Sequence, residues 1–419
     1  MKKYFICWVA LAGVFFLNPI SLWAADGAHG YFRVGAGENL KGGKIDCYRN
    51  KGTFGPEFRL GNECSIYGEL KLEKELNNET QKNSPFQIGA LWAFARNGNS
   101  DWEDGDVALR ELYSEAQNVD GSGYNIWVGK KYYRWSDVYI LDWYPLQFNG
   151  LGAGMSKPSN WDITALVESG STTSNDIGAP AKTSLHWRQE NLELLSVKLD
   201  TWVAGAVTRE HQITTVSSGV TTQYEATQGY LAALKIKSQL LGDSTDFGVV
   251  LGQGNLSDLS PSGVSIEKCS NSTDSDCTVS SSNRVLFYSQ INFERKEKFS
   301  GQAVVAYDRK NLGTQNEGYE EWSSLGLQPV YYFTDQLHLT GLLGYSTVRV
   351  SGQNDKTLFR ATVGPQVSMG KSFWARPVLR AYLSYNQWNN TNISSMASNT
   401  ATKDQNSALG LGFQTEAWF

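Results

Sequence analysis

Apolar and polar residues alternate along most of the chain, and the C-terminal segment, residues 407–419, shows the pattern clearly. From position 409 its odd-numbered residues are mostly apolar: Leu409, Leu411, Phe413, Thr415, Ala417 and Phe419. Its even-numbered residues are mostly small or polar: Gly410, Gly412, Gln414, Glu416 and Trp418. A period of two predicts a β-strand with one apolar and one polar face. The polar face of this strand therefore carries one large aromatic side chain, Trp418.

Segments with the same period recur about every 20 residues, separated alternately by short turns and long polar loops, while helical periodicity is nearly absent. The clearest pair is joined by a turn at 370–372. In the segment after this turn, the pattern places Phe373 and Pro377 on the apolar face, and Trp374 and Arg376 on the polar face. No linker or shift in composition divides the chain, so we expect one architecture throughout.

Long alternating strands in so polar a chain predict an all-β protein, a transmembrane antiparallel β-barrel. Many strands run past ten residues, yet only 41% of residues are hydrophobic and the mean hydropathy is −0.37. A barrel strand needs one apolar residue in two on its lipid face and stays polar on its lumenal face. A soluble sandwich has no need of strands this long.

Aromatic residues and chain length refine this prediction. Aromatic residues reach 12%, and Tyr and Trp at segment ends fit the interfacial girdles of a barrel. The terminal Phe419 is typical of outer-membrane barrels. At about 22 residues per strand and loop, the mature chain would form about 16 to 18 strands, wide enough for a water-filled lumen.

Residues 1–24 have the pattern of a secretory signal peptide. Lys2 and Lys3 precede an apolar run, which is followed by a proline and small residues. Cleavage is expected after Ala24 or Ala25, which leaves residues 25–419 as a barrel in the outer membrane of a Gram-negative bacterium. An uncleaved transmembrane helix is disfavoured because the run is short and no later stretch of about 20 apolar residues exists.

Removal of the signal also removes Cys7 and leaves four cysteines in an oxidising compartment. The economical pairing is two local disulfides, Cys47–Cys64 and Cys269–Cys277, each closing a short polar loop. The segment CSNSTDSDC has no histidine and too few thiols for zinc. DWEDGD lacks the full ligand series of a calcium loop, and the four histidines have no metal spacing. We therefore expect no metal and no cofactor.

Charge and catalytic motifs exclude other classes of function. Loss of Lys2 and Lys3 lowers the formal charge from −5 to −7, so a nucleic-acid partner has no electrostatic basis. A barrel enzyme such as a lipase would need a Ser-His pair, and none can be singled out. The sequence predicts a channel and not an enzyme.

Inward-facing aromatic residues recur on strands that become neighbours when the barrel closes. The alternation places Tyr31 and Arg33 inward on the first strand, and Arg59, Tyr67 and Glu69 inward on the second. On the penultimate and last strands it places Trp374 and Trp418 inward. An indole pointing into water is unfavourable unless a solute stacks on it.

This combination of residues favours a sugar. Pyranose rings have flat C–H faces that lie on aromatic rings, and their hydroxyls accept from arginine and donate to carboxylates. The aromatic set is Tyr31, Tyr67, Trp374 and Trp418. The alternative is a general diffusion porin, whose constriction would be charged but would lack an aromatic stripe.

Several segments resemble the maltoporin family in the same order along the chain. They are HGYFR, RLGNEC with YGELKL, a DW pair with an arginine eight residues on, GKKYYRWSDVYILDWY, WARPVLR and the aromatic end. The resemblance is dense to about Gly154 and again after about Gly326. It implies an 18-stranded homotrimeric channel in outer-membrane lipid, with an aromatic slide, a polar track and an inward-folded constriction loop for oligosaccharides such as maltodextrins.

The resemblance assigns roles to individual residues. Tyr31, Tyr67, Trp374 and Trp418 match slide residues, and Trp102 matches the one that reaches into a neighbouring subunit's mouth. Channel arginines and their acidic partners match Arg33, Arg59, Arg110, Glu69, Asp137 and Asp142. Tyr144 matches the tyrosine that narrows the pore on the inward-folded loop.

Three departures from the family pattern concern the preferred sugar. Trp135 stands where the track has an arginine, although Arg134 adjoins it. Gln147 replaces an acid, and a central slide phenylalanine has no counterpart. The channel class is unaffected by these changes.

Overall fold

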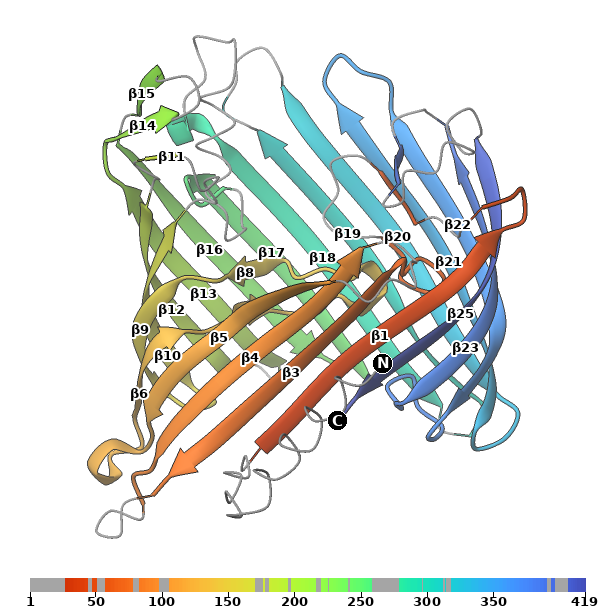
Figure 1. Ribbon diagram of the computed structural model, residues 1–419, viewed down its shortest axis with the longest axis horizontal. Helices are drawn as coiled ribbons and strands as arrows, with labels where there is room; N and C mark the ends of the chain where they lie inside the picture. Colours follow the sequence, from red (N-terminus) through yellow and green to blue (C-terminus); the bar gives the residue numbers. More distant parts are fainter. Residues whose placement is uncertain are drawn as a thin grey trace, which may run out of the picture.

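The computed structural model is a closed barrel of 18 antiparallel strands (Figure 1). It describes residues 27–43, 47–50, 57–77, 83–97, 105–169, 176–177, 181–194, 197–215, 220–224, 226–239, 242–257, 279–295, 297–311, 313, 318–389, 393–395 and 406–419. The barrel strands are β1 (Gly27–Asn39), β3 (Ser65–Leu76), β4 (Phe86–Asn97), β5 (Asp106–Ala116), β6 (Asn125–Lys130), β9 (Leu151–Lys157), β10 (Trp161–Ser169), β12 (Ala181–Leu194), β13 (Val197–Thr208), β16 (Thr227–Ser238), β17 (Ser244–Gly254), β18 (Asn283–Arg295), β19 (Phe299–Asn311), β20 (Tyr319–Tyr332), β21 (Leu337–Val350), β22 (Lys356–Ser368), β23 (Val378–Trp388) and β25 (Ser407–Trp418). The predicted all-β barrel is confirmed, at the upper end of the strand count that length alone predicted.

The barrel closes through its first and last strands, because β1 pairs with both β3 and β25. Tyr31 lies opposite Trp418 on one side and opposite Glu69 on the other. Arg33 lies opposite Glu416 and Tyr67 in the same way. The register therefore brings residues from the two ends of the chain onto one patch of the inner wall.

The two faces of β25 follow the alternation in the sequence. Phe413 and Phe419 point outward and are 66% and 68% exposed. Gln414 and Glu416 point inward and are buried. The lipid face is thus the apolar set, as the period of two predicts.

The two ends of the barrel differ. One end has short turns such as 158–160 and 333–336, and the C-terminus lies there (Figure 1). The other end has longer connections, including a small sheet of β11 (Asp176–Ile177), β14 (His211–Thr215) and β15 (Val220–Tyr224). None of the helical segments in the described ranges has the length and apolar composition to cross a membrane.

The strand predicted after the turn at 370–372 begins later than the alternation indicates. β22 ends at Ser368 and β23 begins at Val378, so residues 373–377 are not part of a strand. Phe373 was expected on the lipid face, but it is only 2% exposed and packs inside the barrel. The reason is local: the Arg376 guanidinium donates to the carbonyl oxygen of Phe373 at 2.9 Å, and Pro377 has no N–H for a ladder.

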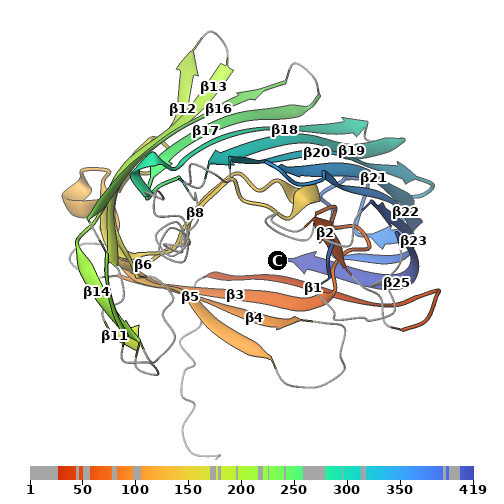
Figure 2. The same cartoon turned by 90° about the horizontal axis from the view of Figure 1, so that it is seen from above.

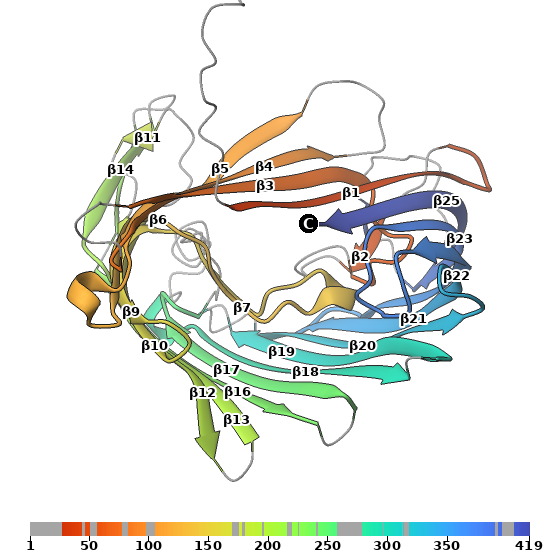
Figure 3. The ribbon, with the colours of Figure 1, turned by 90° about the horizontal axis from the view of Figure 1, so that it is seen from below.

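Two segments fold into the barrel, where Figures 2 and 3 show β2, β7 and β8 inside the ring of strands. The first lumenal segment, which comprises residues 47–50 and 57–64, contains β2 (Tyr48–Asn50). The second lumenal segment, residues 131–150, contains β7 (Tyr133–Trp135), the 3-10 turn η2 (Tyr139–Leu141) and β8 (Leu146–Phe148). The second segment is the predicted inward-folded loop. The first segment was not foreseen as a lumenal element.

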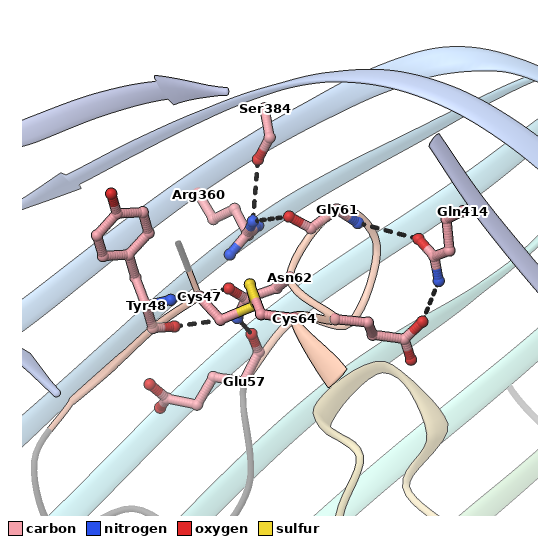
Figure 4. Close-up of a disulfide and its surroundings, with 10 residues drawn as sticks. Cys47, Tyr48, Glu57, Gly61, Asn62, Cys64, Arg360, Ser384 and Gln414 are labelled. Atoms are coloured by element: carbon pink, nitrogen blue, oxygen red, sulfur yellow. Dashed lines mark hydrogen bonds between the residues drawn. A yellow bond between two sulfur atoms is a disulfide. The ribbon is translucent and has the colours of Figure 1, made fainter. Parts of the chain in front are cut away.

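A disulfide between Cys47 and Cys64 ties the two ends of the first lumenal segment together (Figure 4). Within it, the Asn62 side chain accepts from the backbone N–H of Tyr48 at 2.9 Å and donates to the carbonyl of Glu57 at 2.5 Å. This confirms one predicted disulfide. The other, Cys269–Cys277, lies outside the described residues.

The first lumenal segment is anchored by burial. The Phe58 ring packs against Gly344 so closely that a Cβ there would lie 2.5 Å from the ring. The buried Glu57 carboxylate accepts from the Trp322 indole at 2.8 Å. Arg59 was expected on the second strand; it does point into the lumen, but from this segment, because β3 begins only at Ser65.

Candidate functional site

A cavity of about 450 Å³ lies in the lumen between the wall formed by β25, β1 and β3 and the second lumenal segment. Its aromatic lining is Tyr31, Tyr67, Tyr132, Tyr139, Tyr144, Trp374 and Trp418. Its polar lining is Arg33, Arg59, Arg110, Arg134, Glu69, Asp137, Asp142 and Gln147. The structure thus brings together every residue proposed for the slide and the track except Trp102, which lies outside the described residues.

The four proposed slide residues form two pairs of rings along one wall. The ring centroids of Tyr31 and Tyr67 are 6.1 Å apart, and the planes are tilted by 55°. Those of Trp374 and Trp418 are 6.3 Å apart, with a tilt of 43°. The first pair forms because β1 pairs with β3. The second pair forms because Trp374 lies just before β23, which pairs with β25 and so brings Trp374 near Trp418.

The buried carboxylate of Glu416 links several side chains of this wall, and a second buried carboxylate, Glu63, pairs with Arg33 and Arg59 beside it. Glu416 is 0% exposed and accepts from the Arg59 guanidinium at 2.8 Å and from the Arg376 guanidinium at 2.8 Å. It also accepts from the hydroxyls of Tyr139 at 2.6 Å and Tyr31 at 3.1 Å. Sequence reasoning missed Glu416, although its place on the polar face of the last strand, two residues before Trp418, was a signal.

Arg376 fixes the orientation of both tryptophans. Its guanidinium lies 4.2 Å from the centroid of the Trp418 indole and donates to the carbonyls of Phe373 and Ala375 at 2.9 and 3.0 Å. The Tyr139 ring meets the Trp374 ring edge-on at 5.2 Å. Because these contacts come from the wall and from the second lumenal segment, the rings are held in place without a solute.

Charged residues of the second lumenal segment pair with charged residues on the aromatic wall. Arg33 donates to Asp142 at 2.8 Å, and Arg134 lies 3.4 Å from Glu69 and 3.9 Å from the centre of the Tyr132 ring. Among the described residues, Arg110 and Asp137 make no ion pair within 4.0 Å. The Asp137 carboxylate accepts only a long hydrogen bond from Tyr144, at 3.5 Å, among the described residues, so it and Arg110 can bind a solute in the cavity.

The two aspartates of the second lumenal segment differ in their acidity. Asp137 keeps solvent exposure in the lumen, but desolvation by the surrounding protein raises its pKa to about 6, against the opposing effect of Arg59. Burial also acts to raise the pKa of Asp142, but Arg33 and Arg59 outweigh it and hold that pKa below its usual value. Asp142 is thus a fixed charge, and Asp137 titrates near neutral pH.

Trp135 lies outside the cavity. It is 6% exposed, and its ring packs edge-on against Trp202 at 6.4 Å. The alternation within β7 turns Arg134 toward the cavity instead, so the arginine adjoining Trp135 is the one that lines the channel. Tyr132, Arg134 and Tyr139 were not predicted as site residues, because the fold of a lumenal loop is not periodic.

The model of the LamB porin family matches residues 27–419. The chain belongs to the LamB porin family. It is a porin channel of the Gram-negative outer membrane, in agreement with the resemblance seen in the sequence. With the membrane oriented as in such porins, the short turns face the periplasm and the long loops face outward.

The solved structures to which the chain is similar are distant in sequence. OccAB1 of Acinetobacter baumannii is 11% identical, with a TM-score of 0.48 over 94% of this chain and 98% of that chain. OccK1 of Pseudomonas aeruginosa is 10% identical, with a TM-score of 0.46 over the same shares. The trimer form of OmpT of Vibrio cholerae is 10% identical, with a TM-score of 0.37, again over 94% and 98%.

Proposed function

We propose that this porin is selective for sugars and passes oligosaccharides of the maltodextrin type by facilitated diffusion. The observation that carries the proposal is the arrangement of one cavity, in which four rings on one wall face arginines and carboxylates on the lumenal segments. A flat, uncharged, polyhydroxylated solute matches both sides of this cavity at once.

The mechanism follows from the two kinds of contact. The C–H face of each pyranose ring stacks on Tyr31, Tyr67, Trp374 or Trp418 in turn, while its hydroxyls exchange hydrogen bonds with groups such as Arg110 and Asp137. Each contact is weak, on the order of 1 kcal/mol. Several weak sites in series let the sugar move along the wall instead of being trapped.

The proposal extends to the assembly. As the family resemblance implies, we propose a homotrimer in outer-membrane lipid, in which Trp102 of one subunit reaches the mouth of its neighbour. Tyr144 narrows the pore in this account: its hydroxyl lies 3.5 Å from the Asp137 carboxylate, and the Arg134 guanidinium is 4.6 Å from its ring.

Single-channel conductance titrated with a panel of sugars tests the function. Maltodextrins, sucrose and aryl glucosides are added in turn at constant salt, with an acyclic polyol of similar size as a control. We expect saturable block by at least one oligosaccharide and little block by the control. A conductance that falls equally with every solute, in proportion to viscosity, would instead identify a general diffusion porin.

A further inference from the structure

A second cavity, of about 210 Å³, lies on the other side of Tyr132 from the main one. Tyr132 lines both cavities, so the second lies next to the constriction. Its far side is formed by the turn 158–160 between β9 and β10. Because this is one of the short turns, the second cavity is at the periplasmic end of the lumen.

The charges that line this cavity are balanced. Its acidic residues are Glu115, Asp162 and Glu190, and its basic residues are Lys131, Lys157 and Arg188. An ion of either sign would meet as many repulsive as attractive groups here. The lining therefore matches a neutral solute that both donates and accepts hydrogen bonds.

The charged groups are held in pairs beside aromatic rings. Two nitrogens of Arg188, Nε and Nη2, each lie 2.6 Å from the Asp162 carboxylate, and the guanidinium is 4.3 Å from the centre of the Tyr133 ring. Lys131 donates to Glu115, and its ammonium lies 5.2 Å from the centre of the Trp127 ring. Both pairs keep some solvent exposure.

An aromatic surface lies at the edge of the cavity. Trp161 lines it and is only partly buried, and its ring lies 5.8 Å from that of Tyr124. The second cavity therefore repeats the chemistry of the first on a smaller scale, with paired charges beside rings. Sequence reasoning did not find this cavity, because its residues come from separate parts of the chain: β5, β6, β9, β10, β12 and the second lumenal segment.

We infer that the second cavity is an exit site, which binds one sugar ring after it has passed the constriction and before it enters the periplasm. This inference rests on the proposed sugar selectivity and adds a second site in series with the slide. Such a site would shorten the distance between binding positions, and it would also be the first site that a sugar meets when it enters from the periplasmic side.

Sugar association measured separately from each side of an oriented channel in a planar bilayer tests the exit site. The variants are Trp161→Ala and Asp162→Asn, and the sugar is a maltodextrin added to one side only. The matched control is Trp187→Ala, since Trp187 is exposed on the lipid face of β12. We expect both test variants to lower the association rate from the short-turn side by roughly fivefold, with less than about a twofold change from the other side.

The outcomes separate the exit site from the function on which it rests. Normal block from the outer side, with unchanged association from the short-turn side in both test variants, would overturn the exit site alone. An equal loss from both sides would also overturn it, because it would place the effect in the constriction. Wild-type channels that no sugar blocks from either side would overturn the proposed function, and the exit site with it.

Discussion

The lumen has two walls rich in inward aromatic residues, and they serve different purposes. On β25, β1 and β3, the rings of Tyr31, Tyr67 and Trp418 border a cavity. On the opposite wall, Trp202 and Tyr288 are almost fully buried against the second lumenal segment. An inward ring in a barrel is therefore not in itself a sign of a sugar site. The role of an inward ring depends on what lies next to it. On one wall the rings border a cavity with charged groups, and on the other they pack against apolar residues of the second lumenal segment.

The difference also explains why the constriction is held firmly. Trp202 packs on Phe148 at 5.4 Å and on Tyr133 at 6.1 Å, and its indole donates to His186 at 3.1 Å. The second lumenal segment is thus fixed by an apolar core on its far side, which leaves its polar side facing the slide. One wall positions the loop, and the other lines the cavity in which we propose that the solute binds.

The largest effect is expected from the carboxylate that organises the slide wall. Glu416→Gln removes the buried carboxylate that Arg376 and Arg380 share with Arg59, which keeps Glu63 as a second partner. Loss of one partner of a buried ion pair destabilises a protein by about 3–5 kcal/mol. We expect sugar block to weaken roughly tenfold or more, measured by conductance titration, and the thermal unfolding temperature to fall.

Glu321→Gln is the matched control, because Glu321 pairs with Arg309 on the partly exposed part of another wall. Sugar affinity should be unchanged in this control. A Glu416→Gln channel with wild-type sugar block would show that the slide rings do not depend on this carboxylate.

The packing wall should respond in a different way. Trp202→Ala removes a fully buried indole, and we expect the free energy of unfolding to fall by about 3–5 kcal/mol. Because the second lumenal segment loses its support, the ionic conductance should rise and become noisier. Unfolding followed by heat-dependent gel mobility and single-channel recording measure the two effects. Normal stability combined with lost sugar block would reverse the roles given to the two walls.

A smaller effect is expected from pH. The pKa of Asp137 is raised to about 6, so lowering the pH from about 8 to 5 protonates it and removes one negative charge from the cavity. The ratio of cation to anion permeability should therefore fall with falling pH, by less than about twofold. Reversal potentials in a salt gradient measure this ratio. Asp137→Asn should abolish the step, and a step of equal size in that variant would assign it to another group.

The sequence predicted the strands well because a period of two is a local signal. The faces of β25, the closure through β1 and the grouping of Tyr31 with Trp418 all follow from alternation and register. The family resemblance, and not periodicity, identified Asp137, Asp142 and Tyr144 on the second lumenal segment. Lumenal loops have no repeating pattern, so their contacts depend on tertiary structure.

The errors have the same origin. Phe373 was predicted on the lipid face because the apolar-polar alternation was extended through residues 373–377, which do not form a strand in the structure. The end of the first lumenal segment was read as part of the second strand because the apolar-polar alternation was extended back to Arg59. Glu416 appeared to be one polar residue among several, and only the structure shows that three arginines and two tyrosines converge on it.

Sugar titration of the tryptophan variants tests the central claim most directly. Trp374→Ala and Trp418→Ala are compared with wild type and with Trp187→Ala, a lipid-facing control, at the same salt. If the rings are stacking surfaces, each loss should weaken sugar block several-fold, or about 1 kcal/mol, while the ionic conductance stays similar or rises. Equal sugar block in all four channels would contradict the account, because the rings would then only fill the wall.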